Sequence, residues 1–265
     1  KSSMRLAIDA VHKGEAAAVL SAGNTGALMA MAKVVLRTLP GIDRPAIASF
    51  FPTTRSESVM LDLGANVECD ATNLVQFAVM GSVFARTVLG VREPSIGLLN
   101  VGTEEMKGHE EVRGAAQLLR EASHVPGTFH GFIEGDDIAR GVVDVVVTDG
   151  FTGNVALKTI EGTVKLYGHF LRHSFKSSWM AGLGYLMARP ALNALRARLD
   201  PRRYNGAIFM GLNGICVKSH GGTDAFGFAN AIGVAVDMVQ NGAIAKMQAE
   251  FEQMAMLAPQ PAASV

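Results

Sequence analysis

The sequence predicts an α/β fold in which a mainly parallel sheet is covered by helices on both faces. Short apolar runs alternate with stretches of helical periodicity along most of the chain, which is typical of βαβ units. The runs are apolar at nearly every position, as in strands that are buried on both faces. Each run ends in a short polar, glycine-bearing segment, here called an elbow, from which the next helix begins.

Three units of strand, elbow and helix make up the first half of the chain. In the first unit the strand covers 17–20, the elbow covers 21–26, and the helix continues to 36. In the second the strand covers 59–63, the elbow covers 64–66, and the helix begins at about 72. In the third the strand covers 96–100, the elbow covers 101–108, and the helix continues to 122. Asp70 and Asn73, beside the second helix, are residue types that cap helix N-termini. This order predicts parallel strands joined by crossover helices.

A fourth unit begins with the mostly β-branched strand 143–147, turns at 148–154 and becomes helical from Val155. The segment 206–218 is typical of a hairpin-like pair of strands, and a fifth elbow at 219–224 opens another helix. Ligands of open α/β sheets bind beyond the carboxyl ends of the strands. We therefore expect all five elbows to gather at one edge, where glycines and helix N-termini form a single anion-binding cleft.

Composition and charge narrow the class of protein. The 265 residues are 49% hydrophobic and include 29 glycines, which suits one large α/β domain. A net charge of zero argues against nucleic-acid binding by the chain as a whole. Cys69 and Cys216 have no metal-ligand spacing, so we expect reduced thiols in a cytosolic protein and no metal. The longest uncharged stretch, 16–32, is too interrupted to span a membrane.

The elbows lack the best-known catalytic and cofactor fingerprints. None matches G-x-G-x-x-G or the P-loop, so the sequence predicts no dinucleotide or nucleotide cofactor. G-x-S-x-G is missing too, and no Ser/His/Asp or Cys/His arrangement indicates a covalent nucleophile. An enzyme of this kind would position two reactants rather than attack one of them itself.

Lys107 lies in the third elbow among four glutamates, just before a helix. It is either part of a solvated charged turn or a cation for a phosphate or a developing oxyanion. His220 is likewise either a helix-capping residue or a polar group of the cleft. The residues that we expect to bind phosphate or substrate are Ser21, Gly23, Asn24, Thr25, Asn66, Thr103, Asp149, Thr152 and His220.

A basic, apolar segment at about 165–203 predicts a helical hairpin inserted in the domain. It carries eight Lys or Arg residues and one acid, with "GLG" at 182–184 and Pro190 expected to break it into helical pieces. Such a hairpin binds an anionic membrane surface, packs on the core or a dimer mate, or docks an acidic carrier protein. The residues predicted to contact a membrane are Arg172, Lys176, Trp179, Leu183, Leu186, Arg189, Arg196 and Arg198.

Five stretches of the chain together resemble one family closely. They are "SAGNTGALMA", "LDLGANVECD", "LLNVGTEEMKG", "VVVTDGFTGNVALKTIEG" and "VKSHGGTDAFGFANAI". In this order and spacing they resemble the bacterial acyl-ACP:phosphate acyltransferases of phospholipid synthesis, the PlsX family. The resemblance runs from residue 1 to about residue 239 and implies a Rossmann-like three-layer α/β/α sandwich, related to phosphotransacetylases and isocitrate-dehydrogenase-type enzymes.

The resemblance also implies a reaction, a site and partners. Inorganic phosphate would attack the thioester of a long-chain acyl-acyl carrier protein (acyl-ACP), giving acyl phosphate and free carrier thiol. The catalytic lysine and asparagine of the family correspond to Lys107 and Asn154. Asp149, Thr152 and His220 would orient these groups or contact phosphate. The family forms homodimers and associates peripherally with the inner face of the cell membrane, where a glycerol-3-phosphate acyltransferase is a further expected partner.

Two other functions remain as alternatives. One is a phosphotransacetylase-like enzyme that uses acyl-CoA, against which the basic hairpin argues. The other is a non-catalytic, membrane-associated protein that binds phosphate or a lipid precursor. Members of the family begin with a strand and a Met-Gly-Gly-Asp turn that line the site, and this sequence has neither. We therefore expect an N-terminally incomplete α/β domain at 1–256, followed by a disordered tail at 257–265.

Overall fold

The computed structural model describes residues 2–122 and 125–257. Its sheet has eight strands in the order β1-β8-β7-β2-β3-β6-β4-β5. The strands are β1 (Ala18–Ser21), β2 (Ala46–Pro52), β3 (Glu57–Leu61), β4 (Ser95–Leu99), β5 (Thr128–Ile133), β6 (Val145–Val147), β7 (Ala207–Met210) and β8 (Ile215–Lys218). The helices are α1 (Ser3–His12), α2 (Thr25–Leu36), α3 (Ala71–Phe84), η1 (Ala85–Leu89), α4 (Glu110–Glu121), α5 (Gly135–Arg140), α6 (Gly150–Phe175), α7 (Trp179–Arg198), α8 (Ala225–Gln240) and α9 (Ala243–Leu257).

The predicted units are present with small shifts at their ends. The helices that follow are capped by the elbow residues Asn24, Asp149 and Asp224 and, just before α3, by Asp70, as expected for N-cap residue types. Four elements were not predicted from the sequence: β2, β5, α5 and α9. Of the predicted tail, residue 257 ends α9, whereas 258–265 lie outside the described residues.

The sheet is mixed, with four parallel and three antiparallel pairings among the described strands. Strands β3, β6, β4 and β5 are parallel neighbours, and β1 is parallel to β8. However, β8 is antiparallel to β7, β7 to β2, and β2 to β3. Strands β1 and β8 therefore run opposite to β3, β6 and β4.

This polarity corrects the expectation that all five elbows share the carboxyl edge of one parallel sheet. The second, fourth and third elbows follow the neighbouring parallel strands β3, β6 and β4, so they do share an edge. The first and fifth follow β1 and β8, which point the other way. Three successive antiparallel pairings, β8 with β7, β7 with β2 and β2 with β3, reverse the direction between the two groups.

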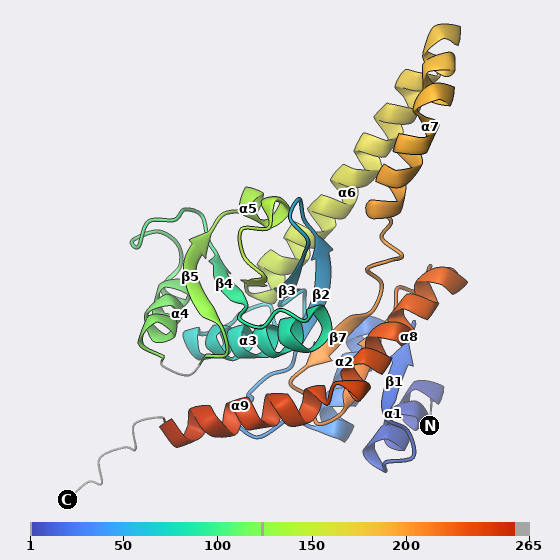
Figure 1. Ribbon diagram of the computed structural model, residues 1–265. Helices are drawn as coiled ribbons and strands as arrows, with labels where there is room; N and C mark the ends of the chain where they lie inside the picture. The colour runs from blue at the N-terminus through green and yellow to red at the C-terminus, as the bar shows by residue number, and fades with distance from the viewer. Residues whose placement is uncertain (1, 123–124, 258–265) are drawn as a thin grey trace, which may run out of the picture.

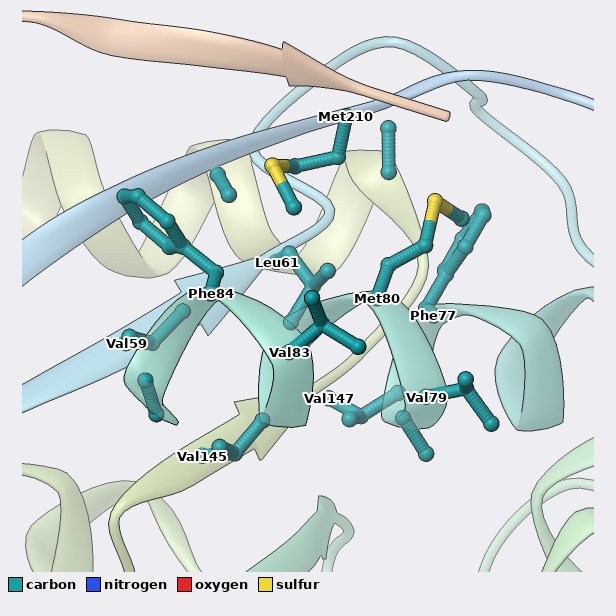
Figure 2. Close-up of a cluster of buried hydrophobic side chains, with 14 of the residues drawn as sticks. Val59, Leu61, Phe77, Val79, Met80, Val83, Phe84, Val145, Val147 and Met210 are labelled. Carbon is teal, nitrogen blue, oxygen red and sulfur yellow. The ribbon is translucent and has the colours of Figure 1, made fainter. Parts of the chain in front are cut away.

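Helices cover both faces of the sheet, which confirms the three-layer prediction (Figure 1). Alternate side chains of each strand enter different clusters: Val59 and Leu61 of β3 face α3, whereas Met60 lies in the cluster beneath α2. Figure 2 shows Phe77, Met80 and Phe84 of α3 packed over these strands. The nearly complete burial of α3 explains why apolar side chains lie on all of its faces rather than in one amphipathic stripe.

The hairpin is formed by α6 and α7, which project away from the rest of the molecule (Figure 1). It begins at the fourth elbow rather than near residue 165, because α6 is continuous from Gly150 to Phe175. The expected breaks at 182–184 and Pro190 are both wrong, since both lie inside the continuous helix α7. Proline removes only one helical hydrogen bond, and the turns on either side keep theirs. No helix of the described chain has the length and hydropathy needed to cross a bilayer.

Candidate active site

The second and fourth elbows are joined around one buried carboxylate, that of Asp62. Asp62 follows β3 and is fully buried. Its oxygens accept hydrogen bonds from the backbone N–H groups of Ile47 (2.9 Å), Gly64 (3.2 Å), Ala65 (3.0 and 3.1 Å) and Asn66 (2.7 Å). The side-chain amide of Asn66 adds a bond of 2.9 Å. Asp62 therefore fixes the whole second elbow.

Burial raises the pKa of Asp62, while the hydrogen bonds from Ile47, Ala65 and Asn66 oppose that shift. Asp62 was not among the predicted site residues, although one acid at the end of an otherwise apolar strand is an available signal. Its role is structural, since its oxygens are occupied by donors of its own elbow and by the N–H of Ile47 in β2.

Two glycines allow the fourth elbow to lie directly against the second. The N–H of Gly150 donates to the carbonyl oxygen of Asn66 at 2.7 Å. A Cβ atom added to Gly150 would lie 2.5 Å from that oxygen, and one added to Gly153 would lie 1.9 Å from the carbonyl oxygen of Asp62. Side chains at either position would separate the two elbows. The glycines of "TDGFTGN" are thus explained by close backbone approach.

The polar residues of the fourth elbow begin α6. Asp149 accepts bonds from the backbone N–H (2.8 Å) and the hydroxyl (2.7 Å) of Thr152, so this pair caps the helix. The Asn154 amide donates to the carbonyl oxygen of Leu63 at 3.0 Å, which anchors its side chain over the second elbow. Residues Asn66, Asp149, Thr152 and Asn154 therefore come together as predicted.

The third elbow is a loop whose backbone is closed by Asn100. The Asn100 side chain donates to the carbonyl oxygen of Lys107 at 3.1 Å, and the Lys107 N–H donates to the carbonyl oxygen of Glu104 at 3.0 Å. Gly108 has a left-handed conformation, with φ of +87°. The side chains of Thr103 and Lys107 are exposed. Because β4 adjoins β6, this loop lies at the same sheet edge as Asn154.

The first and fifth elbows form a separate group at the ends of β1 and β8. The Ser219 N–H donates to the carbonyl oxygen of Ser21 at 3.0 Å, and Asn24 caps α2 through the N–H of Ala27 at 2.9 Å. Gly23 and Thr25 are exposed in the same turn. Ser21, Gly23, Asn24 and Thr25 therefore accompany the fifth elbow rather than Lys107.

A buried amide that the sequence analysis missed holds His220 in place. Asn205 donates to the Ser219 hydroxyl and to the carbonyl oxygen of Gly227, both at 2.8 Å, and accepts the His220 N–H at 2.9 Å. The His220 ring accepts the N–H of Gly222 through Nδ1 at 3.1 Å. The helix cap is Asp224 instead of His220, so the capping interpretation of His220 is wrong.

The described residues include neither a readily ionised thiol nor a cluster of metal ligands. Burial raises the pKa of Cys69 to about 12, with further contributions from the charges of Asp62 and Asp149, and burial raises that of Cys216 to about 12. Such thiols are weak nucleophiles at neutral pH. Within residues 2–122 and 125–257, no three His, Cys, Asp or Glu side chains gather as a metal site would require.

The predicted membrane-contacting residues spread along the whole hairpin. Lys176 lies at its tip, between α6 and α7, and Trp179, the first residue of α7, is 79% exposed. Arg196 and Arg198 lie in the last turn of α7, about 30 Å from the tip at 1.5 Å per residue. Arg198 donates to the carbonyl oxygen of Thr53 at 3.2 Å. It therefore tethers the base of the hairpin to the domain.

The remaining predicted positions, Arg172, Leu183, Leu186 and Arg189, lie on the two helices between tip and base. A hollow of about 820 Å³ adjoins the base and is lined by Leu89, Arg198, Arg203 and Tyr204, among others. It contains no residue of the five elbows.

Comparison with known proteins decides the family. The family described as "Fatty acid synthesis protein" matches residues 1–246. The chain belongs to this family. The resemblance stated from the sequence is thereby confirmed.

Close relatives carry the name phosphate acyltransferase. The protein of that name from Rhodospirillum centenum is 69% identical over 262 residues, covering 96% of this chain and 74% of the relative. The one from Paramagnetospirillum magneticum is 66% identical over 254 residues, covering 96% and 72%. The family member described here thus spans about three quarters of the length of these relatives.

Solved structures confirm the predicted fold relationship. A branched-chain phosphotransacylase from Enterococcus faecalis matches with a TM-score of 0.57 at 14% identity, covering 89% of this chain and 78% of its own. The EutD phosphotransacetylase from Staphylococcus aureus matches with a TM-score of 0.54 at 16% identity, covering 93% and 67%. At such identities the likeness concerns the fold alone.

Proposed function

We propose that this protein transfers a long-chain fatty acyl group from acyl-ACP to inorganic phosphate, giving acyl phosphate for phospholipid synthesis. Membership of the family and the names of relatives at 60–69% identity support the reaction. The observation that carries the assignment of the site is the shared edge of β3, β6 and β4. There Asn154 is anchored over the second elbow, and Lys107 lies in the neighbouring loop.

The chemistry requires no nucleophile from the protein. A phosphate oxygen attacks the thioester carbonyl carbon, the C–O bond forms, and the C–S bond breaks to release the carrier thiolate, which takes a proton from solvent. The protein must hold phosphate beside the carbonyl and stabilise the negative charge that develops on the carbonyl oxygen. The Lys107 ammonium and the Asn154 amide are the donors that we assign to this oxygen.

The other elbow residues support these two. Asp149 and Thr152 fix the first turn of α6 and so hold Asn154 at its position. Asn66 connects Asp62 with Gly150, which fixes the two elbows relative to each other. The N-terminus of α6 directs its dipole at this edge and favours an anion there. We assign phosphate to this position, next to Asn154.

The acyl donor distinguishes the proposal from a phosphotransacetylase-like reaction with acyl-CoA. The structural neighbours support only the shared fold. The exposed basic hairpin favours a carrier-bound, long-chain substrate that is handed to a membrane, because a short-chain soluble reaction needs no such element. Lys107 and the anchored amide of Asn154 at one edge fit the stabilisation of an oxyanion, which a protein that only binds phosphate or a lipid precursor does not have to provide.

We also propose that the hairpin tip associates with the inner face of the cell membrane. Phe170, Trp179, Met180 and Leu183 are large exposed apolar residues near the tip, accompanied by Arg172 and Lys176. Such a combination favours the interface of an anionic bilayer. A homodimer, the carrier protein and a membrane glycerol-3-phosphate acyltransferase that consumes acyl phosphate are the expected partners.

A trapping assay tests the proposed reaction. The protein is mixed with palmitoyl-ACP, with and without phosphate, and acyl phosphate is converted to the hydroxamate with hydroxylamine. We expect a phosphate-dependent product that is lost in Lys107→Ala and strongly reduced in Asn154→Ala. Loss of one oxyanion donor typically lowers kcat about 100- to 1000-fold. Equal turnover of palmitoyl-CoA would support the phosphotransacetylase-like alternative instead.

A further inference from the structure

Lys218 is a cation that the reaction as described does not use. It is the last residue of β8 and is half-buried. Its ammonium donates to the carbonyl oxygen of Ser219, and burial lowers its pKa below the usual 10.5. Among the described residues no carboxylate lies within ion-pair distance of this ammonium.

A half-buried charge without a counter-charge is costly unless an anion joins it. One carbonyl oxygen satisfies at most one of the three N–H donors of an ammonium. Buried lysines in proteins are usually paired for this reason. The acid in the same elbow, Asp224, is already engaged as the helix cap and with Arg202 at 2.7 Å. The described part of the protein therefore provides no counter-charge for the Lys218 ammonium.

The surroundings of Lys218 match a phosphate better than an apolar ligand. Ser21 is its register partner on β1, and Asn24 caps α2 in the adjoining elbow. His220 follows two residues later and is fixed by the buried amide of Asn205. These are short polar groups at the carboxyl ends of two parallel strands, where α/β proteins bind ligands.

We infer that Lys218 binds a phosphate group at the ends of β1 and β8. The inference rests on the proposed function, which brings two phosphates to this protein: inorganic phosphate and the phosphate on the pantetheine arm of the carrier. The first and fifth elbows follow strands that run opposite to the strand before Lys107, and they thereby acquire a cation of their own. Lys218 is then a substrate-binding residue that the motifs did not identify.

Ligand-dependent thermal stability tests the inference without requiring turnover. The melting temperature is measured against inorganic phosphate, against pantetheine 4′-phosphate, and against sodium chloride at matched ionic strength. Each titration is run on the unaltered protein, Lys218→Met, Lys218→Arg and the control Lys246→Met, which removes an exposed cation of α9. Lys218→Met keeps the side-chain length and removes the buried charge, so the unliganded variant is expected to fold.

We expect Lys218→Met to weaken binding of the phosphate compound roughly tenfold or more, because hydrogen bonds to charged groups are lost. Lys218→Arg should retain most of the affinity, and Lys246→Met all of it. The compound that responds identifies the source of the phosphate, and either one supports the inference. Unchanged affinity in Lys218→Met, or no stabilisation of the unaltered protein by either compound, overturns it.

A further variant separates this inference from the proposed reaction. If the phosphate response disappears in Lys107→Met and persists in Lys218→Met, phosphate is held by the third elbow and the inference is wrong. If hydroxylamine traps no acyl phosphate while the Lys218-dependent response is present, the proposed reaction fails and the phosphate site stands.

Discussion

Replacing Asp62 tests the reasoning about how the second and fourth elbows are built. In Asp62→Ala the N–H groups of Ile47, Gly64, Ala65 and Asn66 lose their acceptor. A buried unsatisfied donor costs about 1–3 kcal/mol. The N–H of Ile47 bears the full cost because Ile47 is buried, whereas water reaches part of the elbow. We therefore expect a loss of about 3–5 kcal/mol in the free energy of unfolding.

Asp62→Asn is the sharper variant because it preserves shape. One carboxylate oxygen accepts from the N–H and the side-chain amide of Asn66 and from Ala65, and the other from Ile47, Gly64 and Ala65. In either orientation of the new amide, its NH2 group would point at N–H donors and could not accept their hydrogen bonds. We expect a loss close to that of Asp62→Ala. The control Asp149→Ala removes only an N-cap and should cost about 0.5–2 kcal/mol.

Urea unfolding and hydrogen exchange provide the measurements. Urea midpoints at constant m-value give the change in the free energy of unfolding. Exchange at the Gly150 amide reports the link between the elbows, because that N–H donates to Asn66. An Asp62→Asn protein within about 0.5 kcal/mol of the unaltered one, with Gly150 still protected, would refute the view that an ionised carboxylate organises this site.

Three further predictions address packing, the membrane and the thiols. Gly153→Ala should destabilise the protein by about 1–3 kcal/mol or more in thermal unfolding and disrupt the site, because the added Cβ would lie 1.9 Å from the backbone oxygen of Asp62. The control Gly162→Ala, in the open part of α6, should stabilise the protein by about 0.5–1 kcal/mol. Lys176→Ser at the hairpin tip should weaken binding to anionic vesicles, measured by sedimentation, by about 1 kcal/mol. Arg198→Ser at the base should have little effect, and equal effects of the two changes would contradict membrane contact through the tip. With its pKa raised to about 12 from 9.0, Cys69 should be alkylated at pH 8 about 1000-fold more slowly than an ordinary thiol, and the rate should rise about tenfold per pH unit until it levels off near pH 12.

The hairpin shows which features could be predicted from the sequence pattern and which could not. Its basic and apolar composition predicted two exposed helices, and the structure has them. The role of each basic residue did not follow from the pattern. Arg198 contacts Thr53, a residue 145 positions earlier in the chain, so its place at the hairpin base depends on a tertiary contact. Position along a helix fixes distance from the tip, but only the packed domain fixes which end is anchored.

The sequence alone determined the family, the strand–elbow–helix units and the residues of each elbow. It did so because β-branched runs, helix caps and glycine turns are local signals that act within a few residues. Tertiary structure decided which elbows meet. Strand β2 escaped the pattern, yet its two antiparallel pairings together with that of β7 and β8 leave β1 and β8 opposite in direction to β3, which separates Ser21 and His220 from Lys107 and Asn154. The buried partners Asp62 and Asn205 likewise acquire their roles only from donors that the fold brings to them, because a hydrogen bond depends on proximity in space rather than in sequence.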